Sequence, residues 1–321
     1  MLISHSLAEV PAEFGPSIVT IGNFDGVHRG HQQVMADVRT RARARHARAV
    51  AVTFEPHPVR LLYPQRPHQR ITLPEEKLRL LDATGLDAVL VLPFTRQFAN
   101  LSAEEFARTV LRDALHAVEV HEGEDFHFGH DARAGVLALA GMGKELGFTV
   151  HPHPAVVWRG MPISSSLIRA MVRQGEMRTA RQLLGRPFAV HSRPAPGRGL
   201  GKRHAVPTIN LAEYTELLPA NGVYITCMEV GGEHFGAVTN VGDRPTFGER
   251  SFAVESHLLD FHPIALHSGT PLTLHFLDRL RDERPWPSPQ ALKEQIARDV
   301  ARAQHYFALW KAQQGPLLQE P

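Results

Sequence analysis

The sequence contains a single cysteine, Cys227, among 321 residues, which excludes intramolecular disulfides and cysteine-rich metal sites. Its longest apolar runs are far too short to cross a membrane, and no secretory signal pattern precedes the first predicted strand. The formal net charge of +2 is too small to indicate a nucleic-acid-binding protein. We therefore expect a cytoplasmic protein that binds neither membranes nor nucleic acid, and no feature indicates an oligomeric state.

The chain does contain enough apolar sequence for two cores. Hydrophobic residues make up 43% of it, and its length exceeds that of one typical domain. As far as Gly185, apolar segments alternate with helical patterns, which is typical of a parallel sheet covered by helices on both faces. The predicted strands span 18–21, 49–54, 88–93, 117–121 and 148–151, and the predicted helices span 32–46, 74–84, 102–115, 132–146 and 169–184.

The pattern changes after Gly185, where short alternating strands separated by glycine and proline turns predict a small antiparallel β-barrel. The predicted strands span 223–230, 234–239, 252–260 and 271–277. A final amphipathic helix over 289–310 should pack on the barrel through the stripe Leu292, Ile296, Val300, Ala303, Phe307 and Trp310. We therefore expect a Rossmann-like α/β domain over residues 1–186 and a barrel domain with a C-terminal helix over 187–321.

A glycine-rich segment joins the first predicted strand to the first helix, with the sequence GNFDGVHRGH over residues 22–31. Such a turn offers backbone N–H groups and the positive end of a helix dipole to an anion. His28 and His31, three residues apart, lie on one side of the first helical turn, where both can donate to a phosphate in transfer. A pair of surface histidines is the simpler reading, but the glycine spacing favours a nucleotide site made by Gly22, Asn23, Phe24, Asp25, His28 and His31.

Three hydroxyls precede the last helix of the first domain, in the sequence ISSSLIR over residues 163–169. One hydroxyl is enough for an N-cap, so Ser165, Ser166 and Arg169 are candidate donors to a triphosphate. Two further loops follow predicted strands at the ligand edge of the sheet. His57 lies in the first of them, and Asp125, Phe126 and Phe128 lie in the second, where the aromatic rings either belong to the core or face a flat heterocycle.

The barrel half has a glycine-rich segment of its own, GRGLGK over residues 197–202. It misses the P-loop spacing by one residue, and Arg203 stands where Ser or Thr should hold magnesium, so we reject a Walker site. Thr208 and Asn210 follow in what we expect to be a rigid turn, and their oxygens suit a hard cation such as Mg²⁺ that also binds substrate phosphates. Glu255 is either a solvated carboxylate or a general base.

Together these segments resemble the bacterial bifunctional riboflavin kinase/FAD synthetase family, from Ser17 to Trp310. The first-domain HxGH spacing is similar to that of nucleotidylyltransferases. The matching segments are GNFDGVHRGH, VTFEPHP, FANLSAEEF, GEDFHFGHDARAG and ISSSLIR in the first half, and GKRHAVPTIN, LLPANGVY, NVGDRPTF, VESHLLDF and LRDE in the second.

The resemblance implies a function for each half. In the first, FMN would react with ATP to give FAD and pyrophosphate. His28 and His31 would stabilise the ATP phosphates, and the triphosphate would be held by Ser165, Ser166 and Arg169. Asp125 would contact nucleotide, and the flavin would be bordered by His57, Phe126 and Phe128. In the second, riboflavin would be phosphorylated to FMN. There Gly197, Gly201 and Lys202 would bind ATP, Thr208 and Asn210 would organise Mg²⁺, Glu255 would be the base, and Arg281 and Glu283 would contact flavin.

The barrel half departs from the family pattern before Thr208. Lys202, His204, Ala205 and Val206 replace the usual Arg and Leu-Gly-Phe, so a bidentate guanidinium is lost. One alternative is therefore a monofunctional FAD synthetase with an inactive flavin-binding barrel. A flavin carrier without catalytic activity is another, although a carrier has no use for the two histidines of the first domain. The arginine-rich stretch over 39–48 also suggests nucleic-acid binding, but a solvated helix face explains it better.

Overall fold

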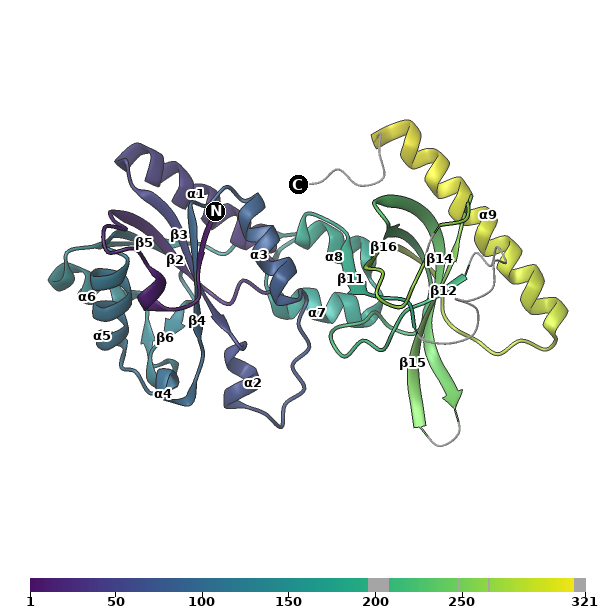
Figure 1. Ribbon diagram of the computed structural model, residues 1–321, viewed down its shortest axis with the longest axis horizontal. Coiled ribbons are helices and arrows are strands. Elements are labelled where there is room, and N and C mark those ends of the chain that lie inside the picture. Colours follow the sequence, from purple (N-terminus) through teal and green to yellow (C-terminus); the bar gives the residue numbers. More distant parts are fainter. Residues whose placement is uncertain (196–207, 247–248, 265, 315–321) are drawn as a thin grey trace. The chain divides into compact units, whose positions relative to one another are not determined.

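The computed structural model describes residues 1–195, 208–246, 249–264 and 266–314 (Figure 1). The chain divides into two compact units, Met1–Ser165 and Ser166–Pro321. The helices that follow Ser165 therefore group with the barrel. In the described part of the chain, no helix has the length and apolar character needed to span a bilayer.

The first unit is built on a six-stranded parallel sheet with the order β1-β4-β3-β2-β5-β8. Its strands are β1 (Leu2–Ser4), β2 (Ser17–Ile21), β3 (Arg48–Glu55), β4 (Ala88–Pro93), β5 (Ala117–Gly123) and β8 (Thr149–His153). The five predicted strands are confirmed. Strand β1 was not predicted because it is only three residues long and its Leu2 and Ile3 are exposed.

Helices cover both faces of this sheet (Figure 1), as the strand–helix alternation predicts. On one face, α1 (Arg29–Arg45) and α3 (Pro74–Ala83) pack on Ile18, Ala51 and Val89. On the other, α5 (Ala103–Phe106), η2 (Ala107–Ala114) and α6 (Val136–Leu146) pack on Val19, Val52 and Leu90. The shorter elements are η1 (Leu7–Glu9), α2 (Pro58–Leu62), α4 (Arg96–Ala99), β6 (His127–Phe128), η3 (His130–Ala132), β7 (Ala134–Gly135), β9 (Val157–Trp158) and β10 (Met161–Pro162).

Three predicted helices differ in detail. The capping box of Ser102 and Glu105 is present, but the helix continues as the π-helix η2 after Phe106. Helix α6 begins later than predicted because Asp131 and Ala132 have left-handed backbones. The single helix over 169–184 is wrong: Gly175, with φ +77°, separates α7 (Ser165–Gln174) from α8 (Met177–Leu184).

The second unit is built on a six-stranded antiparallel sheet with the order β11-β16-β13-β14-β15-β12. Its strands are β11 (Phe188–Ser192), β12 (Thr208–Asn210), β13 (Gly222–Val230), β14 (Glu233–Thr246), β15 (Glu249–Leu258) and β16 (Leu272–Arg281). A bridge between Pro194 and Leu211 joins its two edges, so the sheet curls into a small barrel. The four predicted strands and the barrel are confirmed, whereas β11 was missed and the rigid turn expected at Thr208 and Asn210 is a strand.

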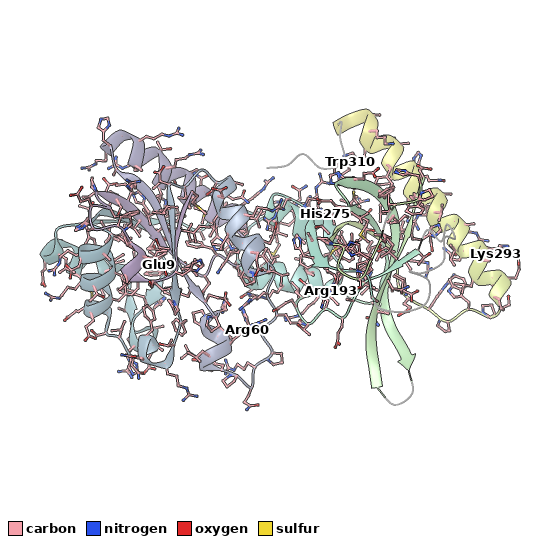
Figure 2. All side chains as sticks on the ribbon, in the orientation of Figure 1. Glu9, Arg60, Arg193, His275, Lys293 and Trp310 are labelled. Carbon is pink, nitrogen blue, oxygen red and sulfur yellow. The ribbon has the colours of Figure 1, made fainter. Side chains whose placement is uncertain are left out.

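Helix α9 (Pro289–Gln314) covers one face of the barrel sheet. Ala303 and Phe307 of the predicted stripe are buried, and a Cβ at Gly236 would lie 2.6 Å from the Phe307 ring. Leu292 and Ile296 are 39% and 44% exposed, so the stripe packs only over its second half. Figure 2 labels Lys293 in the exposed first half of α9 and Trp310 near its end.

Candidate active sites

The turn between β2 and α1 has an unusual backbone that the core holds in place. Phe24 and Val27 have φ of +49° and +36°, and Gly26 between them has φ +85°. A β-branched residue such as Val27 is strained in this region and persists only where the surroundings enforce it. Both side chains are buried in the core between the sheet and α1. The turn therefore has a fixed shape that directs the chain into the N-terminus of α1.

Asp25 secures this turn to the segment before α3. Its buried carboxylate accepts hydrogen bonds from the backbone N–H groups of Ile71, at 3.0 and 3.1 Å, and Thr72, at 3.1 Å. The Thr72 hydroxyl in turn accepts from the backbone N–H of Gly26, at 3.1 Å. On the side of the following helix, the Ser165 hydroxyl donates to the Asp25 carbonyl at 2.9 Å. In this structure Asp25 shapes the turn.

His28 and His31 are brought together at the start of α1, as the spacing predicts. His28 is the N-cap, and its Nδ1 accepts from the backbone N–H of His31 at 3.4 Å. The two rings stack with centroids 3.6 Å apart and planes inclined by 18°. Since Nδ1 of His28 is an acceptor, the proton of its neutral ring lies on Nε2. The pair therefore places imidazole N–H groups beside the backbone amides of a helix N-terminus.

His31 carries a polar atom that no described group satisfies. Its Nδ1 is buried without a hydrogen-bond partner among the described residues. Burial, with the charge of nearby His28 as a smaller cause, holds the pKa of His31 well below its usual value. The ring is thus neutral at pH 7 in the free protein. An anion bound at the turn would supply a partner and raise that pKa.

The serine motif lies at the start of α7. Ser165 is its first residue, and Arg169 follows one helical turn later on the same side. The side chain of Ser166 is exposed, and that of Arg169 is half-buried. The Ser165 hydroxyl belongs to the turn of the first unit through its bond to Asp25. The roles of Ser165, Ser166 and Arg169 toward a triphosphate stay predictions.

A small cavity opens at the ends of β2 and β3, beside the turn. Its volume is about 10 Å³, roughly that of one water molecule, and it is lined by Asn23, Asp25, Glu55, His57, Arg70, Thr72, Pro74 and Lys77. Arg70 and Glu55 form an ion pair, and the Oδ1 of Asn23 is buried without a partner in the described structure. The predicted residues Asn23, Asp25 and His57 thus line one cavity.

Lys77 is a residue of this cavity that the sequence analysis missed. Its ammonium is buried and donates to Thr53 Oγ1, at 3.2 Å, and to the Asn23 carbonyl, at 3.4 Å. Burial lowers its pKa, an effect that the nearby carboxylates of Glu55 and Asp25 oppose. The available signal was a lysine on the otherwise apolar face of the predicted helix over 74–84.

The predicted flavin-side residues lie at two places. His57 caps α2 by accepting from the backbone N–H of Val59 at 3.3 Å, and its ring lies 4.0 Å from that of His68. Phe126 and Phe128 stack 5.4 Å apart, and Phe128 is buried against Phe106. Phe128 therefore belongs to the core, while Phe126 packs half-buried at its edge.

Two acidic residues of β5 and its loop differ in environment. Asp125 is exposed. Glu122 is buried near the carboxyl end of β5 and accepts from the backbone N–H of Ile21, where the glycine-rich turn begins. Burial raises the pKa of Glu122 well above its usual value. Sequence analysis gave Glu122 no role, because the residue lies one position beyond the strand predicted over 117–121.

In the second unit, strand register brings the predicted kinase residues together. Asn210 of β12 lies directly opposite Glu255 of β15, and Glu255 lies opposite Asn240 of β14. Directly paired residues share a face, so these three form one polar row across three strands. On the same face, Thr208 lies opposite His257, and its hydroxyl is 3.4 Å from the His257 Nδ1. Asn240 and His257 were not predicted, because only pairing partners reveal them.

The Glu283 carboxylate reaches this row from the chain after β16. Asn240 Nδ2 donates to Glu283 Oε1 at 3.5 Å, and a Cβ at Gly242 would lie 2.4 Å from the same oxygen. Glycine at position 242 thus leaves room for the carboxylate. Glu283 also lines an open hollow of about 590 Å³ with Asn221, Arg279, Asp282, Arg284 and Pro285.

Arg281 is engaged elsewhere in this structure. Its Nε donates to the buried Asp299 of α9 at 2.9 Å, and its guanidinium lies 5.3 Å from the Trp286 ring centre. It ties the end of β16 to α9, and its role toward flavin stays a prediction. Gly197, Gly201 and Lys202, together with the departures His204, Ala205 and Val206, lie outside the described residues.

The arginine-rich stretch on α1 has structural partners. Arg41 and Arg45 pair with Glu119 of β5, at 2.6 and 2.8 Å, and Arg39 donates to the Thr84 carbonyl at 3.0 Å. These contacts hold α1 on the sheet and to α3. Three of the basic residues in this stretch are thus explained by contacts within the protein, and no nucleic acid is needed to account for them.

Comparison with known proteins matches each half of the chain to a family. Residues 10–167 match the FAD synthetase family, and residues 184–307 match the riboflavin kinase family. Bifunctional riboflavin kinase/FMN adenylyltransferases from Escherichia coli K12 and Pseudomonas fluorescens are 34% and 35% identical, over 96% and 94% of this chain and 97% of each relative. A crystal structure described as a macrolide-efflux protein from Streptococcus pneumoniae superimposes with a TM-score of 0.84 at 28% identity, covering 94% of this chain and 98% of that one.

Proposed function

Because this chain belongs to the family of bifunctional riboflavin kinase/FMN adenylyltransferases, we propose how its two units carry out the two reactions of that family. It phosphorylates riboflavin with ATP to give FMN, and then transfers AMP from a second ATP to FMN, giving FAD and pyrophosphate. The observation that carries the assignment of residues is that each unit has its own polar site: the histidine turn in the first and the Asn210–Glu255–Asn240 row in the second.

In the first unit, a phosphate oxygen of FMN attacks the α-phosphorus of ATP and pyrophosphate leaves. Negative charge grows on the phosphate oxygens in the transition state, so fixed donors accelerate the reaction. His28 and His31 donate to these oxygens at the N-terminus of α1, and Ser165, Ser166 and Arg169 hold the triphosphate. The backbone of Gly22, Asn23 and Phe24 surrounds the nucleotide, with Asp25 holding their turn in shape.

In our proposal the flavin end of the same reaction lies outside this small cavity, beside the residues that line it. Lys77 supplies a positive charge at the end of β3, and the unpartnered Oδ1 of Asn23 offers an acceptor there. His57 borders the flavin with Phe126 at the edge of the aromatic core. Asp125 is exposed at the loop after β5, where it can reach a nucleotide.

In the second unit, the ribityl 5′-hydroxyl attacks the γ-phosphorus of ATP and ADP leaves. Glu255 accepts the hydroxyl proton, and its neighbours Asn210 and Asn240 fix its position across the strands. Glu283 and Arg281 complete the flavin side, and Gly197, Gly201 and Lys202 bind ATP. This transfer depends on positioning and on charge neutralisation more than on covalent chemistry.

The donor set of the row fits a magnesium ion that accompanies ATP. Thr208 and Asn210 present hydroxyl and amide oxygens on one face, next to the Glu255 carboxylate, and oxygen donors are those that Mg²⁺ prefers. When bound, the ion neutralises charge on the transferred phosphoryl group. The protein contributes to metal binding by holding the side chains of Thr208 and Asn210 in order on strand β12. Since both reactions consume ATP, we place the enzyme in the cytoplasm.

Purified protein incubated with riboflavin, ATP and Mg²⁺, followed by chromatographic separation of the flavins, tests the function. We expect FMN to appear first and FAD to follow. FAD made from supplied FMN, without FMN from riboflavin, would instead support the monofunctional alternative. If neither FMN nor FAD forms, the chain is not an enzyme of this kind. Binding of flavin without either product would identify a carrier. The match of the relatives across both units opposes these alternatives.

A further inference from the structure

A second group of histidines lies away from the ATP turn, between α1 and the β5–β8 edge of the first sheet. We define the histidine cluster as His121 of β5 and His151 and His153 of β8, with the carboxylates of Glu119 and Asp37 beside it. The His121 ring lies 4.8 Å from that of His151 and 5.1 Å from that of His153. Neither of the two reactions above uses these residues.

The cluster contains a continuous chain of polar contacts. Asp37 Oδ2 lies 3.4 Å from His153 Nδ1, His153 Nε2 lies 2.9 Å from His121 Nδ1, and His121 Nε2 lies 3.2 Å from Glu119 Oε2. Both carboxylates are acceptors, so each can accept an N–H from the imidazole that faces it, besides the bonds that Glu119 accepts from Arg41 and Asp37 accepts from Gln33. Two neutral imidazoles carry two protons in total. Once both protons point at carboxylates, the two inner nitrogens face each other with lone pairs only.

Two lone pairs 2.9 Å apart are unfavourable unless a cation lies between them. A proton is one such cation and a metal ion is another. Imidazole nitrogens bind Zn²⁺, Cu²⁺ and Ni²⁺, and two ligands on a tetrahedral zinc ion at roughly 2.0 Å lie about 3.3 Å apart. A small rotation of the His153 ring, which is 19% exposed, therefore opens the pair to the required spacing.

We propose that His121 Nδ1 and His153 Nε2 form a binding site for a divalent transition-metal ion of the zinc class. Each ligand then donates its outer N–H to a carboxylate, His153 to Asp37 and His121 to Glu119. Carboxylates in this position fix the tautomer and orientation of metal-binding histidines. Solvent reaches the site past Asp37 and His151, which are each 41% exposed, so water completes the coordination.

The charges around the cluster are compatible with a cation. Glu119 already accepts from Arg41, which lowers its pKa to about 2, and it also pairs with Arg45, so it orients His121 and does not itself bind the metal. The four charges of Asp37, Glu119, Arg41 and Arg45 cancel.

The histidine set also predicts selectivity. Mg²⁺ prefers oxygen ligands and near-ideal octahedral geometry, so the Mg²⁺ that accompanies ATP should not displace the metal from two imidazoles. His151 stacks on His121 and its Nε2 lies 3.6 Å from Glu119 Oε2, so it is not one of the two proposed ligands.

The test is calorimetric titration of the full-length protein with Zn²⁺ in the presence of millimolar Mg²⁺, with Co²⁺ absorption as a second probe of coordination. We expect the wild type to bind one equivalent of zinc, and we expect His153→Gln to bind it with an affinity at least tenfold lower. Asp37→Asn should weaken it by roughly tenfold, because it removes only the orienting carboxylate. His130→Gln is the matched control, since His130 also lies beside a carboxylate, 3.5 Å from Asp131, and should bind zinc like the wild type.

Several results would overturn the proposal. One is a dissociation constant for zinc above about 100 µM, which would leave an ordinary hydrogen bond between the two rings. Another is equal zinc affinity in wild type and His153→Gln, which would place the metal elsewhere, for instance at the His28–His31 pair. Equal weakening by His130→Gln would show nonspecific binding. Circular dichroism of each variant verifies that the fold is retained.

Discussion

The two units build their proposed ATP sites in different ways. The first uses one short turn, in which the strained backbone of Phe24 and Val27 and the capping of α1 by His28 lie within a few residues of each other. The second uses strand register, which places Asn210, Asn240 and Glu255 side by side although up to 45 residues separate them (255 minus 210). A turn-built site depends on backbone shape, whereas a register-built site depends on the pairing of three strands.

This difference predicts how each site responds to change. In the first unit, removing a group that holds the turn should reduce both activity and stability. In the second, Glu255 is only half-buried, so a conservative substitution there should reduce activity with little effect on stability. The following predictions are ordered from the largest expected effect to the smallest.

Glu255→Gln removes the proposed base from the row. We expect riboflavin phosphorylation to fall by on the order of a hundredfold to ten-thousandfold, since general-base catalysis contributes about that much. FAD formation from supplied FMN should be unchanged. Rates of both half-reactions, measured separately, check this. If Glu255→Gln phosphorylates riboflavin at the wild-type rate, the base is a different group.

His31→Ala removes one donor to the phosphates in the first unit. FAD formation from FMN should fall by on the order of a hundredfold or more, the loss typical of one stabilising donor in a preorganised site. His46→Ala, an exposed histidine at the other end of α1, is the matched control and should keep full activity. A comparable loss in both variants would mean that α1 is damaged generally.

Asp25→Asn tests whether the turn depends on its carboxylate. The amide cannot accept all the N–H bonds from Ile71 and Thr72, so the free energy of unfolding should fall by about 1–3 kcal/mol. FAD formation should fall with it. Denaturant unfolding measures the change, and Asp113→Asn, an exposed carboxylate, is the control. Lost activity at full stability would assign Asp25 a direct contact with substrate instead.

Glu122→Gln tests the buried carboxyl group below the turn. Its folded pKa is raised, so it contributes stability at pH values below its unfolded pKa, and that contribution is lost as pH rises. The variant should therefore be more stable than the wild type at pH 8, by on the order of 1 kcal/mol, and the gain should shrink toward pH 4. Denaturant unfolding at both pH values, with exposed Glu145→Gln as control, measures it. A gain that does not vary with pH would contradict a titrating Glu122.

Sequence reasoning reached the two sites to different depths for the same physical reason. The histidine turn is local, so glycine spacing and strand-to-helix context were enough to predict that His28 and His31 come together. Lys77 was missed because its burial depends on packing between distant segments, and Glu122 was missed because it lies one position beyond the predicted strand. Asn240 and His257 were missed because register is a property of paired strands, and β12 was mistaken for a turn because its three residues form a strand only by pairing with β15.

The helix errors have local causes that a pattern does not show. Gly175 breaks the predicted helix over 169–184 because it takes a left-handed backbone, which apolar periodicity does not register. The exposed Leu292 and Ile296 show that an apolar stripe predicts a buried face only where a partner surface extends far enough.

Isotope tracing tests the claim of two separate ATP sites most directly. When the reaction starts from riboflavin, ATP labelled at the γ-phosphorus should leave its label in the flavin in both wild type and His31→Ala, because the Asn210–Glu255–Asn240 row is intact in both. ATP labelled at the α-phosphorus should label FAD in the wild type and almost none in His31→Ala. Loss of both labels in His31→Ala would contradict the account, since it would mean that one ATP site serves both reactions.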